Sequence, residues 1–109
     1  MTRKMYYGQE VATAETTVRL VHNLQESRYE GWLGDELAGF AQYQLTPELI
    51  VFNHTETDPK FAGKGIGSTI VRFALDDVRG AGTHKVMPLC SFVKSWIDHH
   101  PDYCNLLLS

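Results

Sequence analysis

The stretch from Asp58 to Leu75 constrains this chain more than any other. It reads as the end of a β-rich segment, a glycine-rich turn and the start of a helix. The glycines Gly63, Gly65 and Gly67 allow positive φ angles and a close approach of the backbone to a ligand. The first amides of such a helix lack partners within it, and the helix dipole adds partial positive charge, which favours an anion such as a phosphate. An ordinary glycine-rich connection would have the same local sequence, so the motif needs support from the rest of the chain.

Size and charge limit the classes of protein and of partner. A length of 109 residues suits one compact domain, and a net charge of −3 argues against a dedicated nucleic-acid binder. No apolar run is long enough to cross a bilayer, and the start lacks the apolar core of a signal peptide. Cys90 and Cys104 form no CxxC pair, so we expect free thiols. We therefore place the protein in the cytoplasm, without nucleic acid or membrane as a partner.

Hydrophobic periodicity predicts a β-meander followed by a β-loop-α-β-α unit. Residues 1–16 show no clean period, so we expect a loose N-terminal arm before a domain over residues 17–109. Strands are expected at 18–22, 28–33, 36–45, 48–57 and 83–88, and helices at 66–79 and 91–100. In the strand 48–57, the even-numbered face is expected to carry Ile50, Phe52, His54 and Glu56. The fold class is α/β (α+β), with a mostly antiparallel central sheet and two helices in the C-terminal half.

This order of elements, joined with three short stretches, resembles a known family. The stretches are His54-Thr-Glu56, Gly63-Lys-Gly-Ile-Gly-Ser68, and Pro88-Leu-Cys-Ser-Phe-Val93 followed by His100-Pro-Asp-Tyr103. Together they resemble the small single-domain, YjdJ-like branch of the GNAT N-acetyltransferases. The resemblance implies a minimal GNAT-like fold and transfer of an acetyl group from acetyl-CoA to an amine, with a protein acceptor left open.

The resemblance also assigns the pyrophosphate of the cofactor to the glycine loop. The family pattern Gln/Arg-x-x-Gly-x-Gly/Ala ends on Gly65-Ile66-Gly67, but its first position falls on Ala62. We therefore expect modest affinity for coenzyme A, with Lys60 or Lys64 supplying the missing charge. The residues expected to contact acetyl-CoA or CoA are Lys60, Gly63, Lys64, Gly65, Ile66, Gly67, Ser68, Ser91 and Phe92.

Cys90 is a candidate nucleophile because it follows a strand and opens a helix. Free amides and the helix dipole favour its thiolate there, and a thiolate beside a thioester can carry the acetyl group in two steps. A small buried hydrophobic residue would fit the same position equally well. If the transfer is direct, Glu56 or His54 is the candidate general base for the amine.

Two other interpretations of the chain lead to different expectations. His54-x-Glu56 and Pro88-x-Cys90 partly match the zinc deaminase signature, but Leu89 and Val93 stand where cysteines are needed, so we expect no metal site. The alternative function is a non-catalytic CoA-binding or protein-interaction module. It would show ligand binding without transfer of the acetyl group.

Overall fold

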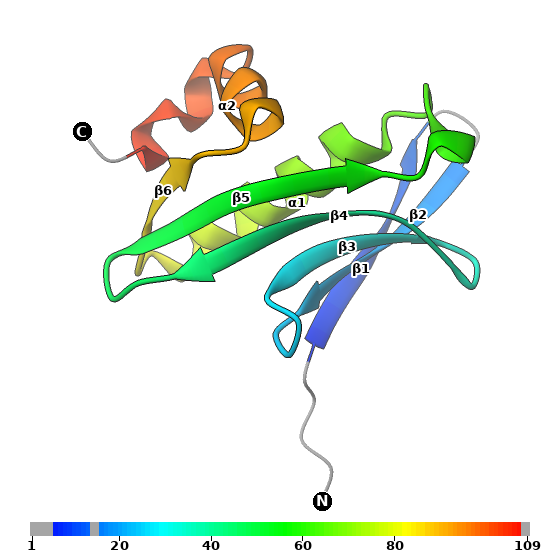
Figure 1. Ribbon diagram of the computed structural model, residues 1–109, viewed down its shortest axis with the longest axis horizontal. Coiled ribbons are helices and arrows are strands. Elements are labelled where there is room, and N and C mark those ends of the chain that lie inside the picture. The colour runs from blue at the N-terminus through cyan, green and yellow to red at the C-terminus, as the bar shows by residue number, and fades with distance from the viewer. Residues whose placement is uncertain (1–5, 14–15, 108–109) are drawn as a thin grey trace, which may run out of the picture.

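Six strands form one sheet whose spatial order follows the chain (Figure 1). The computed structural model describes residues 6–13 and 16–107, and their side chains from residue 17 onward. The strands are β1 (Tyr6–Thr13), β2 (Thr16–Asn23), β3 (Arg28–Leu33), β4 (Glu36–Leu45), β5 (Leu49–Thr57) and β6 (Lys85–Pro88). Strands β1 to β5 pair antiparallel and β6 pairs parallel to β5. The predicted fold class is therefore confirmed, with the central position of β5 between β4 and β6.

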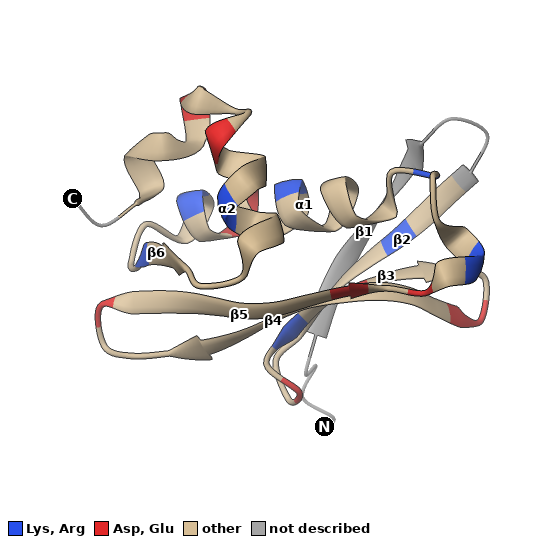
Figure 2. Ribbon diagram, turned by 45° about the horizontal axis from the view of Figure 1, so that its top comes forward, with Lys and Arg blue, Asp and Glu red and all other residues tan. Residues whose placement is uncertain are grey.

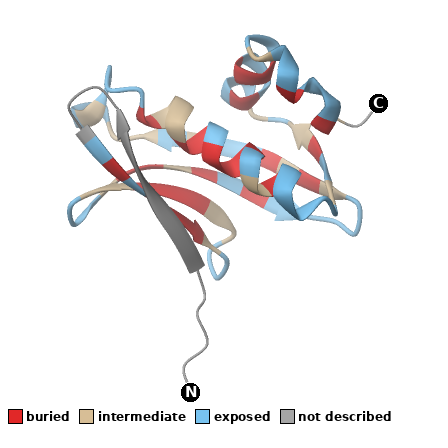
Figure 3. Cartoon of the chain, turned by 180° about the vertical axis from the view of Figure 1, so that it is seen from behind, coloured by how far each residue is buried: buried red, intermediate tan, exposed pale blue. Residues whose placement is uncertain are grey.

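Helix α1 (Ile66–Ala81) connects β5 to β6 and covers one face of the sheet. Its apolar positions recur at helical spacing, so one stripe is buried against the strands while the opposite face stays exposed (Figure 3). The buried stripe contains Ile66, Ile70, Val71, Phe73, Ala74, Leu75 and Val78. Gly82 ends the helix in the left-handed conformation, at φ 67°.

The C-terminal part of the chain packs at the β6 edge and against α1. It contains helix α2 (Ser91–Asp98) and the 3-10 helix η2 (Pro101–Leu106), while a second 3-10 helix, η1 (Pro59–Phe61), follows β5. Helix α2 ends at Asp98, two residues earlier than predicted and three residues before Pro101, which cannot continue a helix. Among the described residues, neither helix has the length and apolar character required to span a membrane.

The expected loose N-terminal arm is wrong for residues 6–13. These residues form β1, which pairs with β2 from Tyr6 opposite Asn23 to Thr13 opposite Thr16. Order here comes from backbone hydrogen bonds to a neighbouring strand, which do not require the clean alternation that periodicity detects. Thr16, the last residue of the expected arm, begins β2, and residues 1–5 and 14–15 lie outside the described residues.

A bulge in β5 exchanges the faces of its second half. Gln42 pairs with His54 while the next residue, Tyr43, pairs with Phe52, so Asn53 is an extra residue on β5. Ile50 and Phe52 face α1 and are buried at 4% and 1% exposure. After the bulge, Thr55 takes that face opposite the fully buried Ala41. The prediction that His54 and Glu56 share a face with Ile50 and Phe52 is therefore wrong, because one extra residue reverses the alternation.

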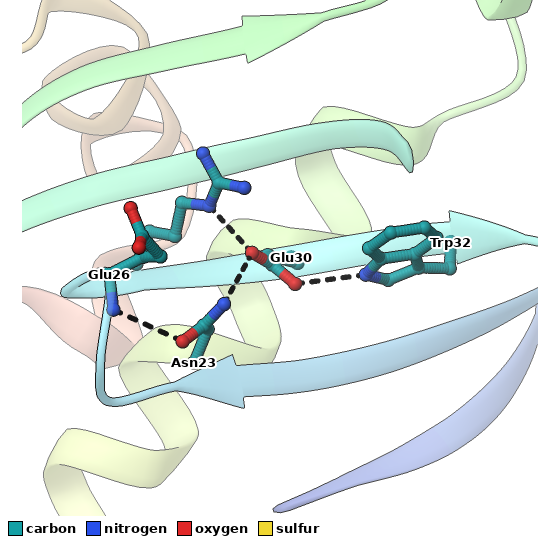
Figure 4. A network of polar contacts seen from close by, with 5 residues as sticks. Asn23, Glu26, Glu30 and Trp32 are labelled. Atoms are coloured by element: carbon teal, nitrogen blue, oxygen red, sulfur yellow. Dashed lines mark hydrogen bonds and ion pairs between the residues drawn. The ribbon is translucent and has the colours of Figure 1, made fainter. Parts of the chain in front are cut away.

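A buried carboxylate organises the face of β3 turned away from α1 (Figure 4). Glu30 is 2% exposed and accepts hydrogen bonds from Arg28 Nε at 2.6 Å, Trp32 Nε1 at 2.9 Å and Asn23 Nδ2 at 3.0 Å. Burial acts to raise the pKa of Glu30, but these three donors outweigh it and leave the pKa below its ordinary value. The carboxylate therefore stays charged and fixes the β2–β3 turn, where Asn23 also accepts from the amide of Glu26.

Candidate functional site

The loop before α1 presents an open turn rather than a capped helix start. Gly63 and Gly65 have φ angles of 83° and 73°, the left-handed region that favours glycine. Gly65 is the N-cap of α1 and no side chain caps the helix there. A Cβ placed at Gly63 or at Gly65 would meet nothing within 4 Å apart from its chain neighbours, so the side-chain positions of both glycines are open. The turn therefore has the room and the exposed amides that an anionic ligand requires.

Gly67 is required for a different reason, which is close packing. A Cβ at Gly67 would lie 3.0 Å from the Phe92 ring and 3.3 Å from Thr57 Oγ1. Phe92 comes from the first turn of α2 and is 43% exposed, so it lies outside the buried side of α2, which Val93, Trp96 and Ile97 form. The close approach places the start of α1 against both the end of β5 and the start of α2.

The predicted basic residues differ in their surroundings. Lys60 Nζ lies 2.5 Å from Glu36 Oε2, and this hydrogen bond raises the pKa of Lys60. The charge of Lys60 is therefore partly neutralised by Glu36 at the start of β4, whereas Lys64 is exposed within the loop itself. Figure 2 shows basic positions in the segment leading into α1 and acidic positions at the nearby β3–β4 turn.

Strands β5 and β6 stop pairing and diverge beside this loop. Their pairing runs from Leu49 with Lys85 to Phe52 with Pro88, and the Cys90 amide then donates to the Phe52 carbonyl at 2.9 Å. Beyond that point β5 continues to Thr57 alongside β4, while the chain after β6 turns into α2 (Figure 1). The bulge turns Thr55 and Thr57 toward the region that this divergence opens.

Cys90 lies where the strands diverge, at the N-cap of α2. Its Sγ is 3.3 Å from Thr55 Oγ1, and the side chain is partly buried against the core. Burial acts to raise the pKa of Cys90, but hydrogen bonds from Thr55 and from the amides of Phe92 and Val93 lower it more, so the net shift is downward. The other cysteine, Cys104, is exposed in η2. The predicted position of Cys90, at the start of a helix that follows a strand, is confirmed.

His54 and Glu56 lie on the opposite face of β5 from Cys90. Their side chains are 54% and 62% exposed, and His54 Nε2 is 3.5 Å from Glu56 Oε1. The His54 ring contacts the Phe40 ring of β4, with a centroid distance of 5.9 Å. The structure thus brings Cys90 together with Thr55, and places the two candidate bases across the strand from them.

The remaining predicted contact residues have distinct structural roles. Ser68 Oγ accepts a 2.8 Å hydrogen bond from Trp96 Nε1, which ties α1 to α2. Ile66 is 1% exposed, so its side chain belongs to the core and only its backbone faces the turn. Ser91 is exposed at the start of α2. Within residues 6–13 and 16–107, no group of three His, Cys, Asp or Glu side chains could hold a metal ion.

Sequence reasoning missed Thr55 and Thr57 as members of the site. Their orientation depends on the bulge at Asn53, and no residue in Asn53–Thr57 is apolar enough to reveal which face is buried. The only signal in the sequence is the alternation of residues along the strand, which would place Thr55 and Thr57 on the face opposite Phe52. The extra residue of the bulge exchanges the two faces, so the alternation assigns both threonines to the wrong one.

Comparisons with known proteins point to one family. The sequence model of the GCN5-related N-acetyl-transferase family matches residues 28–106, a range that includes every candidate site residue. A GCN5-like protein from Staphylococcus aureus, provisionally classed as an N-acetyltransferase and determined in solution by NMR, has a similar fold. Its TM-score is 0.61 at 20% identity, over 77% of this chain and 83% of that chain. A search of curated proteins finds no match.

Proposed function

Because the chain belongs to the GCN5-related N-acetyltransferase family, we propose that it binds acetyl-CoA at the loop before α1 and transfers the acetyl group to an amine. The family supplies the class of enzyme, an acetyl-CoA-dependent N-acetyltransferase. One observation carries the proposed site: the uncapped start of α1 lies against Thr57 and Phe92, next to the half-buried thiol of Cys90.

The pyrophosphate of acetyl-CoA fits the turn from Gly63 to Ser68. The backbone amides at the start of α1 are the donors, and the positive end of the helix dipole adds attraction for the negative charge. Lys64 is the nearest exposed cation in the loop, while Lys60 is engaged by Glu36. Ala62 offers no side-chain donor where the family pattern has Gln or Arg, so the affinity is expected to be modest.

The pantetheine arm would then run from the turn toward Cys90 along Phe92. The Phe92 and Leu89 side chains are 43% and 67% exposed, and both flank Cys90 in the chain. Covering these apolar surfaces with the arm would remove them from water, which stabilises the complex. This path places the thioester beside Cys90 and Thr55, where β5 and β6 have stopped pairing.

The lowered pKa of Cys90 supports transfer through the cysteine. In the first step the Cys90 thiolate attacks the thioester carbonyl carbon, the bond to the coenzyme sulfur breaks, and the coenzyme leaves as its thiolate. In the second step the amine attacks the acetyl-cysteine, the Cys90 thiolate leaves, and the amine loses a proton to a base. Amides at the start of α2 and the Thr55 hydroxyl are the groups that stabilise the thiolate in both steps.

A direct transfer is the second candidate, and the exposed pair on the other face of β5 favours it. Glu56 and His54 are accessible to an amine that approaches from the face opposite α1. The amine would attack the thioester in one step while Glu56 or His54 takes its proton, and the coenzyme thiolate would leave. Cys90 would then contribute only packing and polarity.

Mass spectrometry of the protein after incubation with acetyl-CoA separates these cases. Transfer through the cysteine predicts one added acetyl group on Cys90 and release of free coenzyme thiol. Cys104→Ser is the matched control and should behave as the unmodified protein, whereas Cys90→Ser should lose both signals and turnover with an amine.

Full turnover by Cys90→Ser would reject the cysteine route in favour of direct transfer. Binding of acetyl-CoA without transfer to any amine would instead identify a CoA-binding module, and the absence of binding would reject the proposed function.

A further inference from the structure

Trp96 of α2 contacts two side chains of α1 that lie on the same face of that helix. Its indole Nε1 donates to Ser68 Oγ at 2.8 Å, and the guanidinium carbon of Arg72 lies 5.2 Å from the centre of its ring. Ser68 and Arg72 are four residues apart, so they are neighbours on one helix face, about 6 Å apart along the axis. Trp96 itself is buried, whereas Arg72 is exposed. The indole therefore holds both residues at the surface seam between α1 and α2.

The Ser68 hydroxyl is left with a proton to donate. An indole N–H can only donate, so its bond to Ser68 Oγ occupies a lone pair of the oxygen and leaves the O–H group unused. No described residue accepts a hydrogen bond from this hydroxyl. Ser68 is the third residue of α1, within the first turn, whose backbone amides have no partner inside the helix. A hydroxyl donor thus joins the amides at the turn where we place the pyrophosphate of the coenzyme.

Arg72 also has donors available for an anion. Its Nη1 donates to the Tyr103 hydroxyl at 3.2 Å, and a guanidinium has five N–H groups in all. In the described part of the chain Arg72 makes no ion pair, and Asp76 is linked to it only through the Tyr103 hydroxyl, which donates to Asp76 Oδ1 at 2.7 Å. Lys60 and Lys94, by comparison, each contact a carboxylate directly. Arg72 is therefore the cation near the start of α1 that a second anion can engage.

We propose that Ser68 and Arg72 form a phosphate site for coenzyme A, in place of the side chain that the family pattern has at Ala62. This site rests on the proposed function, which puts the pyrophosphate of the coenzyme on the turn before α1. From that turn the acyl end runs toward Cys90, and the nucleotide end leaves along the exposed seam of α1 and α2. A phosphate on this path accepts from the Ser68 hydroxyl and from the Arg72 guanidinium, which can contact two of its oxygens.

Two features hold Arg72 ready for this contact. Long side chains on a helix lean toward its N-terminal end, so Arg72 covers the helix surface on the side of Ser68. Its contact with the Trp96 ring fixes a flexible side chain in advance, which lowers the entropy cost of binding an anion. Figure 2 shows basic positions on α1 next to α2. The structure thus supplies a preorganised guanidinium one helical turn beyond the glycine loop.

Binding of free CoA tests the site without turnover. In calorimetric titrations, Arg72→Gln should raise the Kd for CoA about tenfold, and Arg72→Lys should recover only part of this loss, because an ammonium group does not match phosphate at two points. Arg79→Gln is the matched control, since Arg79 lies about 10 Å further along the same helix and donates to the Asp102 carbonyl. Salt screens its charge at that distance, so the Kd should change less than about twofold. A normal Kd in Arg72→Gln, or an equal loss in Arg79→Gln, would overturn the proposal.

The ligand 3′-dephospho-CoA identifies the phosphate that Arg72 contacts. If Arg72→Gln leaves the Kd for this ligand unchanged, Arg72 binds the 3′-phosphate. If it raises that Kd by the same factor as for CoA, Arg72 binds the pyrophosphate. Either result supports the site, whereas tighter binding of either ligand by Arg72→Gln would contradict it.

Ser68 and Trp96 are tested together, because the indole is a positioning group that acts through the hydroxyl. Ser68→Ala should weaken CoA binding severalfold. Trp96→Phe keeps a ring beneath Arg72 but removes the N–H group, so it should weaken binding alone and add nothing in the Ser68→Ala background. Additive losses would contradict the positioning role, and if Trp96→Phe does not fold, a normal Kd in Ser68→Ala still overturns the proposal. Failure of the unmodified protein to bind CoA would reject the proposed function, whereas CoA binding that is indifferent to Ser68 and Arg72 would reject this inference alone.

Discussion

Gly67→Ala tests whether the start of α1 has to stay clear of side chains for acetyl-CoA to bind. The new methyl carbon would lie 3.0 Å from Phe92 Cζ and 3.3 Å from Thr57 Oγ1. Both distances are shorter than ordinary contact, so one neighbour has to give way. Phe92 is the one that can, because its ring is 43% exposed and α2 does not depend on it for its buried side. The expected result is a displaced Phe92 ring in a folded protein.

Two effects on stability nearly cancel in this variant. Alanine in place of glycine within a helix stabilises by about 0.5–1 kcal/mol. Moving the Phe92 ring off its preferred rotamer costs about 0.5–1.5 kcal/mol. The free energy of unfolding should therefore change by less than about 1 kcal/mol. Binding has no such compensation, because the methyl group and the displaced ring both occupy the path of the pantetheine arm. We expect the Kd for acetyl-CoA to rise about tenfold, which corresponds to about 1.4 kcal/mol.

Denaturant unfolding and calorimetric titration with acetyl-CoA measure the two quantities separately. Gly80→Ala is the matched control, since Gly80 lies in the same helix and a Cβ there meets nothing within 4 Å. It should stabilise the fold by about 0.5–1 kcal/mol and leave the Kd unchanged. If Gly67→Ala gives the same two results as Gly80→Ala, the proposed path beside Phe92 is wrong.

Three further predictions follow from single residues. Ala62→Arg should tighten CoA binding in a direct titration, because a guanidinium can contact phosphate through two hydrogen bonds; an unchanged Kd would show that the loop holds no pyrophosphate. Iodoacetamide near neutral pH should label Cys90 before Cys104, and CoA should protect Cys90; peptide mapping that finds Cys90 unreactive would mark it as a core residue. Glu30 has a lowered pKa in the folded state, so its stabilising effect is present above its ordinary value of 4.5 and is lost as pH falls through the folded value. Unfolding curves from pH 6 to pH 3 should therefore fall less steeply for Glu30→Gln, and parallel curves would contradict this reasoning.

The helix α1 and the loop before it could be predicted because their signals are local. The apolar stripe of Ile70, Ala74 and Val78 follows the helical period, and Gly82 stops the helix in the conformation that glycine favours. Cys90 could be placed at a helix start for the same reason, since the strand before it and the helix after it each carry their own pattern.

The orientation of residues 54–57 could not be predicted because it depends on pairing with another strand. The extra residue at Asn53 is visible only in the register between β4 and β5. From the sequence alone, His54 and Glu56 continued the face of Phe52, yet Thr55 and Thr57 are the residues turned toward α1. The strand at Tyr6–Thr13 was missed on similar grounds, because its order comes from backbone pairing with β2. Hydrogen bonding to a neighbouring strand, rather than residue type, determines both the orientation of residues 54–57 and the strand at Tyr6–Thr13.

Amide chemical shifts measured during an acetyl-CoA titration report where on the domain acetyl-CoA binds. The largest shifts should fall on Gly63–Ser68, on Thr55 and Thr57, and on the start of α2 at Cys90. Signals of His22 and Asp77, at the far end of α1, should stay in place. Shifts that spare the Gly63–Ser68 turn and centre elsewhere in the domain would show that acetyl-CoA does not bind at this turn.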